Sequence, residues 1–341
     1  MLVRLAIQQR SADVSNSYLP WAYFDRRFVP VSEARLPVGC HAVQYGQGVF
    51  AGIRGYLDQD GSTINVFRLP DHFKRFVQSA SIIKVTPPGP PEALAEILVE
   101  LTRRNAPAGD VYYRPFAYDE GEGLGPSLSG SGFAIYMLPV GDLTPQNGLA
   151  VMVSSWRRVT DNAIPARGKI SGAYVNSALV REDARVSGFD DAIVLNERGK
   201  VAEASVANLM IVRGGTLITP AVTGDILEGI TRRSLLLLAR DMGVPIEERE
   251  VDRTELYVAD EIFLCGTGAQ FAPVVSVDRR TVGTGEPGPI SAALRRRFMD
   301  IVRGREPQYA GWLTRVPAAA PRDAGQPPAH REQATQPAGA A

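Results

Sequence analysis

Ala166-Arg-Gly-Lys-Ile-Ser-Gly-Ala-Tyr174 is the stretch from which we interpret this chain, and its central residue is Lys169. The chain has 37 Lys plus Arg residues, but only four are lysines: Lys74, Lys84, Lys169 and Lys200. A lysine kept in an arginine-rich chain suggests chemistry that Arg cannot perform, such as Schiff-base formation by a neutral amine. A surface charge is the simpler interpretation of any single lysine, so the choice depends on the rest of the chain.

The composition is that of an ordinary globular protein. The 341 residues are 45% hydrophobic and 22% charged, which is enough chain for two domains with separate cores. The formal net charge is zero, so nothing points to nucleic acid or an anionic membrane surface as a partner. We expect no signal peptide and no membrane span, because no apolar run is long enough.

Cysteine and histidine are too sparse for a disulfide framework or a metal centre. Cys40 and Cys265 have no CxxC or CxxH spacing, and the three histidines are scattered (His41, His72 and His330). We therefore predict a reduced, cytoplasmic protein without a metal.

Composition shifts divide the chain into five expected segments. Gly-Asp, Thr-Pro and Asn-Gly pairs indicate a linker, and an Ala-, Pro-, Gln- and Gly-rich end cannot form a core. The segments are an N-terminal arm (1–20), a small α+β domain (21–138), a linker (139–148), a larger domain (149–315) and a disordered tail (316–341).

In the first half, hydrophobic periodicity predicts both helices and strands. Apolar residues at helical spacing follow Pro70 to about Lys84, and again from Glu92 to Asn105. Strands are expected at 21–24, 28–31, 64–68, 111–118 and 133–138. Gly46, Gly48 and Gly52 have the spacing GxGxxxG without a preceding buried strand, so we reject a dinucleotide-binding motif.

The second half has the same mixed character. A strand at 149–154 and a helix at 173–186 flank the Lys169 stretch, and helices are also expected at 229–242 and 289–303. We predict a three-strand meander from 192–196, 201–212 and 216–219, with further strands at 245–250, 261–265 and 273–277. The class is α+β.

Glu203 interrupts an apolar strand. It is therefore a candidate partner for a protonated ring nitrogen of a bound cofactor. A carboxylate among Val201, Ala202 and Ala204 is costly unless it is paired. The alternative, a Glu on the exposed face of a hairpin, has about even odds from the sequence alone.

Two segments suit a phosphate. Leu227-Glu-Gly-Ile-Thr231 places free N–H groups and a hydroxyl at the first turn of a helix. Gly266-Thr-Gly-Ala269 adds backbone N–H groups and the Thr267 hydroxyl just after a strand. Either segment alone is also typical of a plain turn. Arg54, Arg75 and Arg114 are the cations that could meet phosphate or a substrate carboxylate.

The order of these motifs resembles the fold-type-IV (class IV) pyridoxal phosphate aminotransferases, and within them the branched-chain amino acid aminotransferases. The resemblance runs from about Trp21 to Val316. It is carried by Tyr45-Gly-Gln-Gly-Val-Phe-Ala-Gly-Ile-Arg54, His72-Phe-Lys-Arg75, Tyr112-Tyr-Arg-Pro115, Lys169-Ile-Ser-Gly-Ala-Tyr174, Glu203-Ala-Ser-Val-Ala-Asn-Leu209, Leu227-Glu-Gly-Ile-Thr231 and Cys265-Gly-Thr-Gly-Ala269.

The resemblance implies a role for each matching residue. Lys169 would bind the cofactor, pyridoxal 5′-phosphate, and move the proton. The other cofactor contacts would be Glu203 at the ring nitrogen, Tyr174 at the phenolic oxygen, Leu227 against the ring, and Arg75, Ile230, Thr231 and Thr267 at the phosphate. The substrate would lie among Tyr45, Phe50, Gly52, Arg54, Tyr112, Arg114, Gly268 and Ala269.

The resemblance also implies an activity and an assembly. The activity is amino transfer between a branched-chain or hydrophobic L-amino acid and 2-oxoglutarate. The fold is a small α+β domain and a larger pseudo-barrel domain, in a homodimer or a dimer-based hexamer whose partner subunit closes the site with a loop. D-amino-acid transaminase, (R)-amine transaminase and aminodeoxychorismate lyase share this fold and remain alternatives. A non-catalytic binding or assembly protein is the alternative from a different class.

Two positions depart from the family pattern. The family usually has Glu where this chain has Ala51 and Ala207. Because Ala51 follows Phe50 in the substrate-lining motif, we expect it to affect substrate choice by leaving a nearby cation, such as Arg114, less neutralised.

Overall fold

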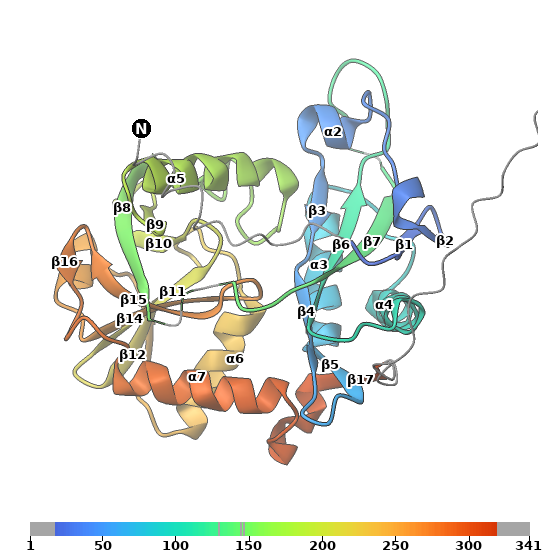
Figure 1. Cartoon of the computed structure of the whole chain (residues 1–341). Coiled ribbons are helices and arrows are strands. Elements are labelled where there is room, and N and C mark those ends of the chain that lie inside the picture. The colour runs from blue at the N-terminus through green and yellow to red at the C-terminus, as the bar shows by residue number, and fades with distance from the viewer. Residues whose placement is uncertain (1–17, 129, 144, 146, 319–341) are drawn as a thin grey trace, which may run out of the picture.

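The computed structural model describes residues 18–128, 130–143, 145 and 147–318. The expected arm up to residue 17, and the expected tail from residue 319, lie outside these ranges. The described chain forms two β-sheets with helices packed against both, which confirms the α+β class (Figure 1).

The first sheet is antiparallel and holds residues from both ends of the described chain. Its strand order is β17-β5-β4-β6-β7-β1-β2, and β3 also pairs with β6. The bounds are β1 (Trp21–Phe24), β2 (Arg27–Pro30), β3 (Gly48–Phe50), β4 (Ile53–Leu57), β5 (Thr63–Phe67), β6 (Val111–Tyr118), β7 (Gly132–Pro139) and β17 (Leu313–Pro317).

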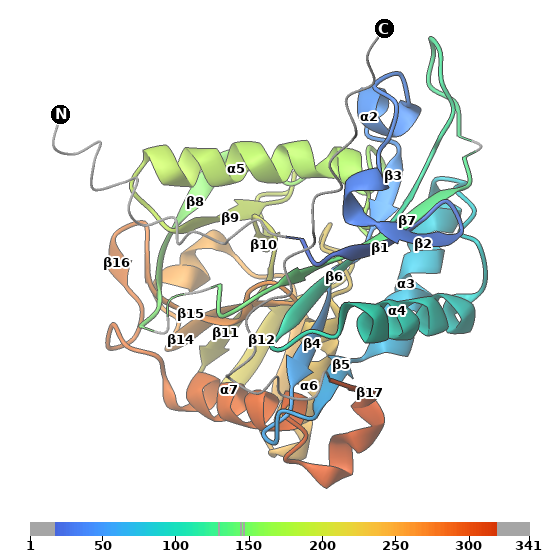
Figure 2. The ribbon, with the colours of Figure 1, turned by 45° about the vertical axis from the view of Figure 1, so that its right-hand side comes forward.

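Two helices cover one face of this sheet (Figures 1 and 2). Helix α3 (Leu69–Ile82) has Pro70 in its first turn and buries Phe73 and Phe76, while α4 (Pro91–Asn105) buries Leu94 and Leu98. Both helices have the predicted periodicity, and they pack with the inward residues of the sheet into one core. The short helix α2 (His41–Tyr45) lies beyond the end of β3 and was not predicted.

The second sheet is mixed and curled. Its strand order is β10-β9-β8-β15-β14-β11-β12-β13, with β16 beside β15, and β10 also lies near β11 and β12, which closes the curl. Its strands are β8 (Leu149–Arg157), β9 (Asp191–Leu195), β10 (Val201–Ala204), β11 (Asn208–Arg213), β12 (Thr216–Pro220), β13 (Ile246–Arg249), β14 (Glu261–Gly266), β15 (Gln270–Val277) and β16 (Arg280–Thr281).

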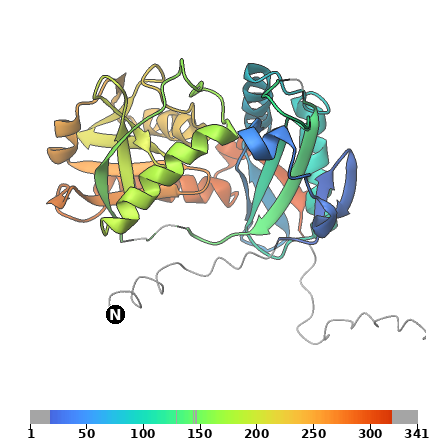
Figure 3. The ribbon, with the colours of Figure 1, turned by 90° about the horizontal axis from the view of Figure 1, so that it is seen from above.

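Three helices pack around the second sheet, and two of them join it to the first. Helix α5 (Tyr174–Val186) lies along β8 and β9, whereas α6 (Ile230–Asp241) and α7 (Pro289–Val302) contact β14. One apolar core combines Leu235 and Phe298 of these helices with Tyr56 and Phe67 of the first sheet. Seen from above, the two sheets lie side by side with α5 next to α2 (Figure 3). The division into two domains at 139–148 stays a prediction.

Two sequence-based expectations need correction. The single strand expected at 201–212 is interrupted after Ala204, where the Ala204 N–H donates to Ala207 O at 2.8 Å, and β10 and β11 take different places in the sheet. The tail was also expected from residue 316, but Val316 is fully buried and Pro317 ends β17, because this strand pairs with β5.

Candidate active site

Lys169 lies on the loop before the short helix η2 (Ser171–Ala173), and its backbone is bonded to the first sheet. The Phe50 N–H donates to Lys169 O at 3.0 Å, and the Lys169 N–H donates to Ser79 Oγ on α3 at 3.2 Å. Gly172 N–H donates to Gly46 O at 3.1 Å. Gly46 has a φ of +66°, and a Cβ there would lie 2.9 Å from Gly172 Cα, so this approach requires glycine. The loop is therefore fixed against β3 and α3.

The Lys169 amine lies between two aromatic rings and close to two arginines. Its Nζ hydrogen-bonds the Tyr174 hydroxyl and is 5.1 Å from the centre of the Phe50 ring. Burial, and then the positive charges of Arg75 and Arg114, lower the pKa of Lys169 to about 7. A substantial fraction of the amine is therefore neutral and nucleophilic at neutral pH.

Glu203 is the buried carboxylate of the site. Its Oε1 is 3.0 Å from Nη2 of Arg158, and its Oε2 accepts from Asn208 Nδ2 at 3.0 Å and the Leu227 N–H at 3.2 Å. Burial raises the pKa of Glu203 above its ordinary value, and the Arg158 guanidinium is the largest effect in the opposite direction. The alternative of an exposed hairpin Glu is wrong, because Glu203 is only 6% exposed.

Arg158 is a site residue that the sequence reasoning missed. Its side chain is 12% exposed, whereas Arg157 beside it is exposed. Arg157 ends β8 and Arg158 follows it, and no spacing or neighbour in the sequence shows which of the two turns inward.

The N-terminus of α6 faces Arg75, as we expect if this segment and Arg75 bind a phosphate together. Arg75 Nη1 donates to Glu228 O at 3.0 Å, and burial lowers the pKa of Arg75 to about 10. Gly229 is the residue before the helix, where a Cβ would lie 2.0 Å from Asn208 Oδ1. Ile230 and Thr231 follow in the first turn, and both are buried. The structure thus joins Arg75 to the first turn of α6, where free N–H groups favour an anion.

The second segment expected to bind the phosphate is the turn between β14 and β15. Thr267 lies in this turn, and a Cβ built at Gly266 would be 3.8 Å from Ala207 Cα. A Cβ built at Gly268 would meet no described atom within 4 Å, so this turn borders open space. The turn lies against the interruption between β10, which carries Glu203, and β11, which begins at Asn208.

Phe50 and Arg114 lie together near the Lys169 amine. The Arg114 guanidinium lies over the Phe50 ring at 4.6 Å from its centre, and Arg114 Nη2 is 3.3 Å from the Tyr112 hydroxyl. A Cβ at Gly52 would lie 1.8 Å from that hydroxyl, so Gly52 makes room for Tyr112. The buried Nε of Arg114 has no hydrogen-bond partner among the described residues. A polar group of a ligand could satisfy it.

Arg54 is a buried cation with unused donors. It is 1% exposed, and its Nη2 donates to Gly141 O at 2.5 Å, but Nε and Nη1 have no partner in the described part of the chain. A buried guanidinium with unused donors is unfavourable by itself, so it favours the approach of an anion.

The remaining expected residues differ in their surroundings. Tyr45 is 40% exposed, and its hydroxyl accepts from the Gly125 N–H at 3.2 Å, so it faces the 119–131 loop. Ala269 completes the turn described above. Ala51 lies between β3 and β4, and it is 1% exposed because it packs into the core of the first sheet, not on the pocket wall that we expected. Ala207 is buried in the core of the second sheet.

Within the described residues, no group of His, Cys, Asp and Glu side chains is arranged to hold a metal ion. The same ranges contain no helix with the length and apolar character needed to span a bilayer.

Comparisons with known proteins agree with the geometry. The family described as "Amino-transferase class IV" matches residues 48–277. A "Probable branched-chain-amino-acid aminotransferase" of Synechocystis sp. is 40% identical over 305 residues, which cover 89% of this chain and 99% of that protein.

Solved structures give the same result. The branched-chain aminotransferase of Thermoproteus uzoniensis with norvaline is 38% identical with a TM-score of 0.84, covering 88% of this chain and 99% of that one. The branched-chain amino acid aminotransferase of Thermobaculum terrenum in its PLP form is 37% identical with a TM-score of 0.83, covering 87% and 98%.

Proposed function

The chain belongs to the class IV aminotransferases, among the branched-chain-amino-acid aminotransferases, and from this premise we propose its reaction. It transfers an amino group from a branched-chain or other hydrophobic L-amino acid to 2-oxoglutarate, and the products are the 2-oxo acid and L-glutamate. The observation that carries this proposal is Lys169, because a pKa of about 7 makes its amine reactive at the point where both sheets meet.

The residues present fit pyridoxal 5′-phosphate as the cofactor. The amine of Lys169, the carboxylate of Glu203, and the α6 N-terminus with Arg75 match its aldehyde, ring nitrogen and phosphate. When bound, this cofactor supplies the aldehyde that receives the amino group and a ring that accepts electrons from the reacting carbon.

The side chains of the site have distinct tasks in amino transfer. Lys169 Nζ takes a proton from the α-carbon of the amino acid and returns a proton in the second half of the reaction. A base with a pKa near 7 is suited to both transfers at neutral pH. The Tyr174 hydroxyl orients this amine through their hydrogen bond. Glu203, when ionised, would retain a proton on the ring nitrogen of the cofactor. Arg75 and the first turn of α6 would hold its phosphate.

The substrate has apolar and cationic surroundings. Phe50 offers an aromatic surface to a branched side chain. Arg114 and Arg54 have unused N–H donors, and Tyr112 presents its hydroxyl beside Arg114, so these groups suit the carboxylates of the amino acid and of 2-oxoglutarate.

The direct test is a donor panel with 2-oxoglutarate as acceptor. We expect glutamate to form from L-leucine, L-valine and L-isoleucine, with preferences within about 10–200-fold, because one methylene is worth roughly 1–3 kcal/mol in an apolar pocket. If D-alanine or a simple (R)-amine exceeds L-leucine by more than about a hundredfold, the branched-chain assignment is wrong although amino transfer stands.

Two further outcomes would change the proposal more deeply. Pyruvate release from aminodeoxychorismate, without amino transfer to any 2-oxo acid, would identify a lyase. Purified protein that takes up no pyridoxal phosphate would instead support a binding or assembly protein on the same scaffold. No particular residue of the site favours either of these alternatives over amino transfer.

We also propose a homodimer, or a hexamer built from dimers. Exposed apolar side chains occur along α5 (Val175, Leu179, Val186), on and near α2 (Val38, Val43) and in the 119–131 loop, where Leu124 is fully exposed. Helices α2 and α5 lie on the same side of the molecule, so a second copy could cover them together (Figure 3). The compartment we propose is the cytoplasm, in keeping with two free, buried cysteines.

A further inference from the structure

Arg158 lies immediately after β8, with its side chain turned toward Glu203. Its backbone N–H donates to Leu195 O at 2.9 Å, so the residue stays in line with the neighbouring strand. Its Nε donates to Asp225 O at 3.1 Å, and its Nη2 is 3.0 Å from Glu203 Oε1. Two anchors therefore fix the guanidinium plane before any ligand binds.

The two oxygens of Glu203 have different partners. Oε2 accepts from two neutral donors, Asn208 Nδ2 and the Leu227 N–H, while Asn208 itself also donates to Leu227 O. Oε1 has Arg158. A carboxylate bound on both oxygens has one fixed orientation.

Arg158 is the only cation in ion-pair contact with Glu203 within the described ranges. Arg232 is also near, but its guanidinium binds Thr219, Pro220 O and Glu248. The Lys169 amine bonds Tyr174 instead. The titratable or charged groups that act on Glu203 or are acted on by it are Arg158, Lys169, Arg232, Tyr174 and Cys265.

We infer that Arg158 is a positioning residue, which keeps Glu203 ionised and oriented toward the ring nitrogen of the cofactor. This inference rests on the proposed function. Arg158 does not act on the substrate; it acts through Glu203. Without the guanidinium, the buried carboxyl group of Glu203 gains a proton more readily. The neutral acid then no longer stabilises the proton on the ring nitrogen.

The first experiment compares Arg158→Met with Arg198→Met in the holoenzyme. Arg198 is an exposed arginine that pairs with Glu250 and serves as the matched control. Pyridoxal phosphate release is followed by its visible absorbance during dilution. We expect about 10–100-fold weaker binding at pH 7 for Arg158→Met, because more of Glu203 is then protonated, and less than about twofold for the control.

The pH profile separates this role from simple loss of packing. Raising the pH ionises Glu203 again, so the deficit of Arg158→Met should shrink as pH rises from 6 to 9. Arg158→Lys keeps a charge and should recover part of the affinity. It also serves as the test if the Met variant does not fold.

A double variant decides whether Arg158 acts through Glu203. If it does, adding Arg158→Met to Glu203→Gln should weaken cofactor binding by less than about threefold. Full additivity of the two losses would overturn the inference, as would a pH-independent deficit. If Arg158→Met matches Arg198→Met while wild-type protein binds the cofactor, this inference fails and the proposed function stands. A wild type without cofactor uptake would end both.

Discussion

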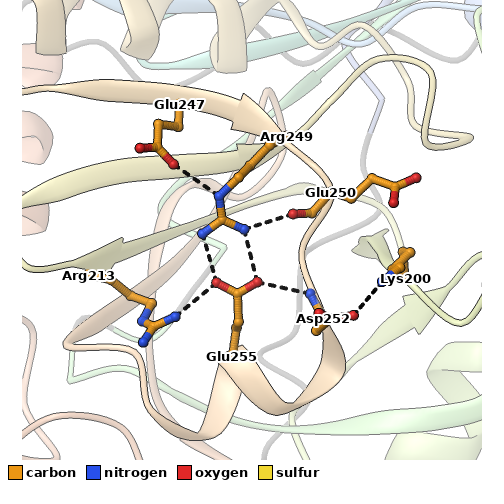
Figure 4. A network of polar contacts seen from close by, with 7 residues as sticks. All are labelled: Lys200, Arg213, Glu247, Arg249, Glu250, Asp252 and Glu255. Atoms are coloured by element: carbon orange, nitrogen blue, oxygen red, sulfur yellow. Dashed lines mark hydrogen bonds and ion pairs between the residues drawn. The ribbon is translucent and has the colours of Figure 1, made fainter.

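Glu203 and Glu255 are both paired with arginine, yet their pKa values move in opposite directions. Glu203 in the site has its pKa raised by burial despite Arg158. Glu255 lies in a polar network next to the end of β13 (Figure 4), where Arg249 binds both of its oxygens at 2.8 and 2.9 Å. Hydrogen bonds from Arg249 lower the pKa of Glu255 to about 2. An ion pair therefore does not set the pKa by itself; burial decides which effect wins.

The lysines of the two regions repeat this contrast. Lys200 belongs to the same network as Glu255 and bonds Asp252 at 2.6 Å, which raises its pKa (Figure 4). At Lys169, burial and the positive charges of Arg75 and Arg114 outweigh the opposing effect of Glu203, and its pKa falls to about 7. The network stabilises the charged forms of Glu255 and Lys200. The site instead favours the neutral amine of Lys169, next to a Glu203 carboxylate whose ionised form is opposed by burial.

The largest test of this contrast removes each lysine in turn. Lys169→Ala should lower turnover at least about 10⁴-fold and abolish the visible absorbance of bound cofactor, because the proposed covalent anchor and base would both be gone. Lys200→Ala should leave turnover within about twofold. Comparable losses in both variants would show that Lys169 has no special role.

A second test measures the neutral amines directly in cofactor-free protein. Reductive methylation at pH 7 modifies only unprotonated amines, so Lys169 should react about 100-fold faster than Lys200. Peptide mass spectrometry can follow all four lysines. The rate at Lys169 should rise with pH and level off above about 8, and equal rates at the two lysines would contradict a lowered pKa.

The smallest effect concerns stability and pH. A lowered carboxyl pKa stabilises the fold above the unfolded value of about 4.3, and this contribution is lost as pH falls toward 2. Glu255→Gln should therefore destabilise the protein by roughly 1–2 kcal/mol at pH 7, after allowance for solvent screening, and by less at pH 3.

Glu203 should show the opposite slope. Its raised pKa contributes stability at low pH that is lost as pH rises through the folded value. Relative to Glu203→Gln, cofactor-free wild type should become less stable from pH 4 upward. Urea unfolding across this pH range measures the stability difference between wild type and each Gln variant. If the differences for Glu203 and Glu255 change with pH in the same direction, the contrast between the two carboxylates is wrong.

Sequence patterns predicted those helices and site residues that are determined by their neighbours in the chain. The apolar spacing after Pro70 and in 289–303 predicted α3 and α7 to within two residues, because amphipathic helices are encoded locally. Lys169 and Glu203 were also identifiable. One is a rare residue in a glycine-rich loop, and the other is a charge in an apolar run.

What the sequence could not predict depends on distant partners. Nothing in Ser205-Val-Ala207 marks the end of β10, since neither Gly nor Pro occurs there. The interruption is stabilised by Asn208, which bonds Glu203 and Leu227 across the turn. Arg158 is likewise defined by Glu203, 45 residues away in the chain, and not by its neighbours.

The strand β17 has a consequence for how the protein is made. It covers the edge of β5, so that edge stays bare until residues 313–317 have left the ribosome. At roughly 5–20 residues per second, the wait lasts from about ten seconds to a minute. Throughout that interval the nascent chain presents an open template for foreign strands. Ribosome-associated chaperones should therefore matter more for the yield of this protein than for one whose N-terminal sheet is completed early in translation.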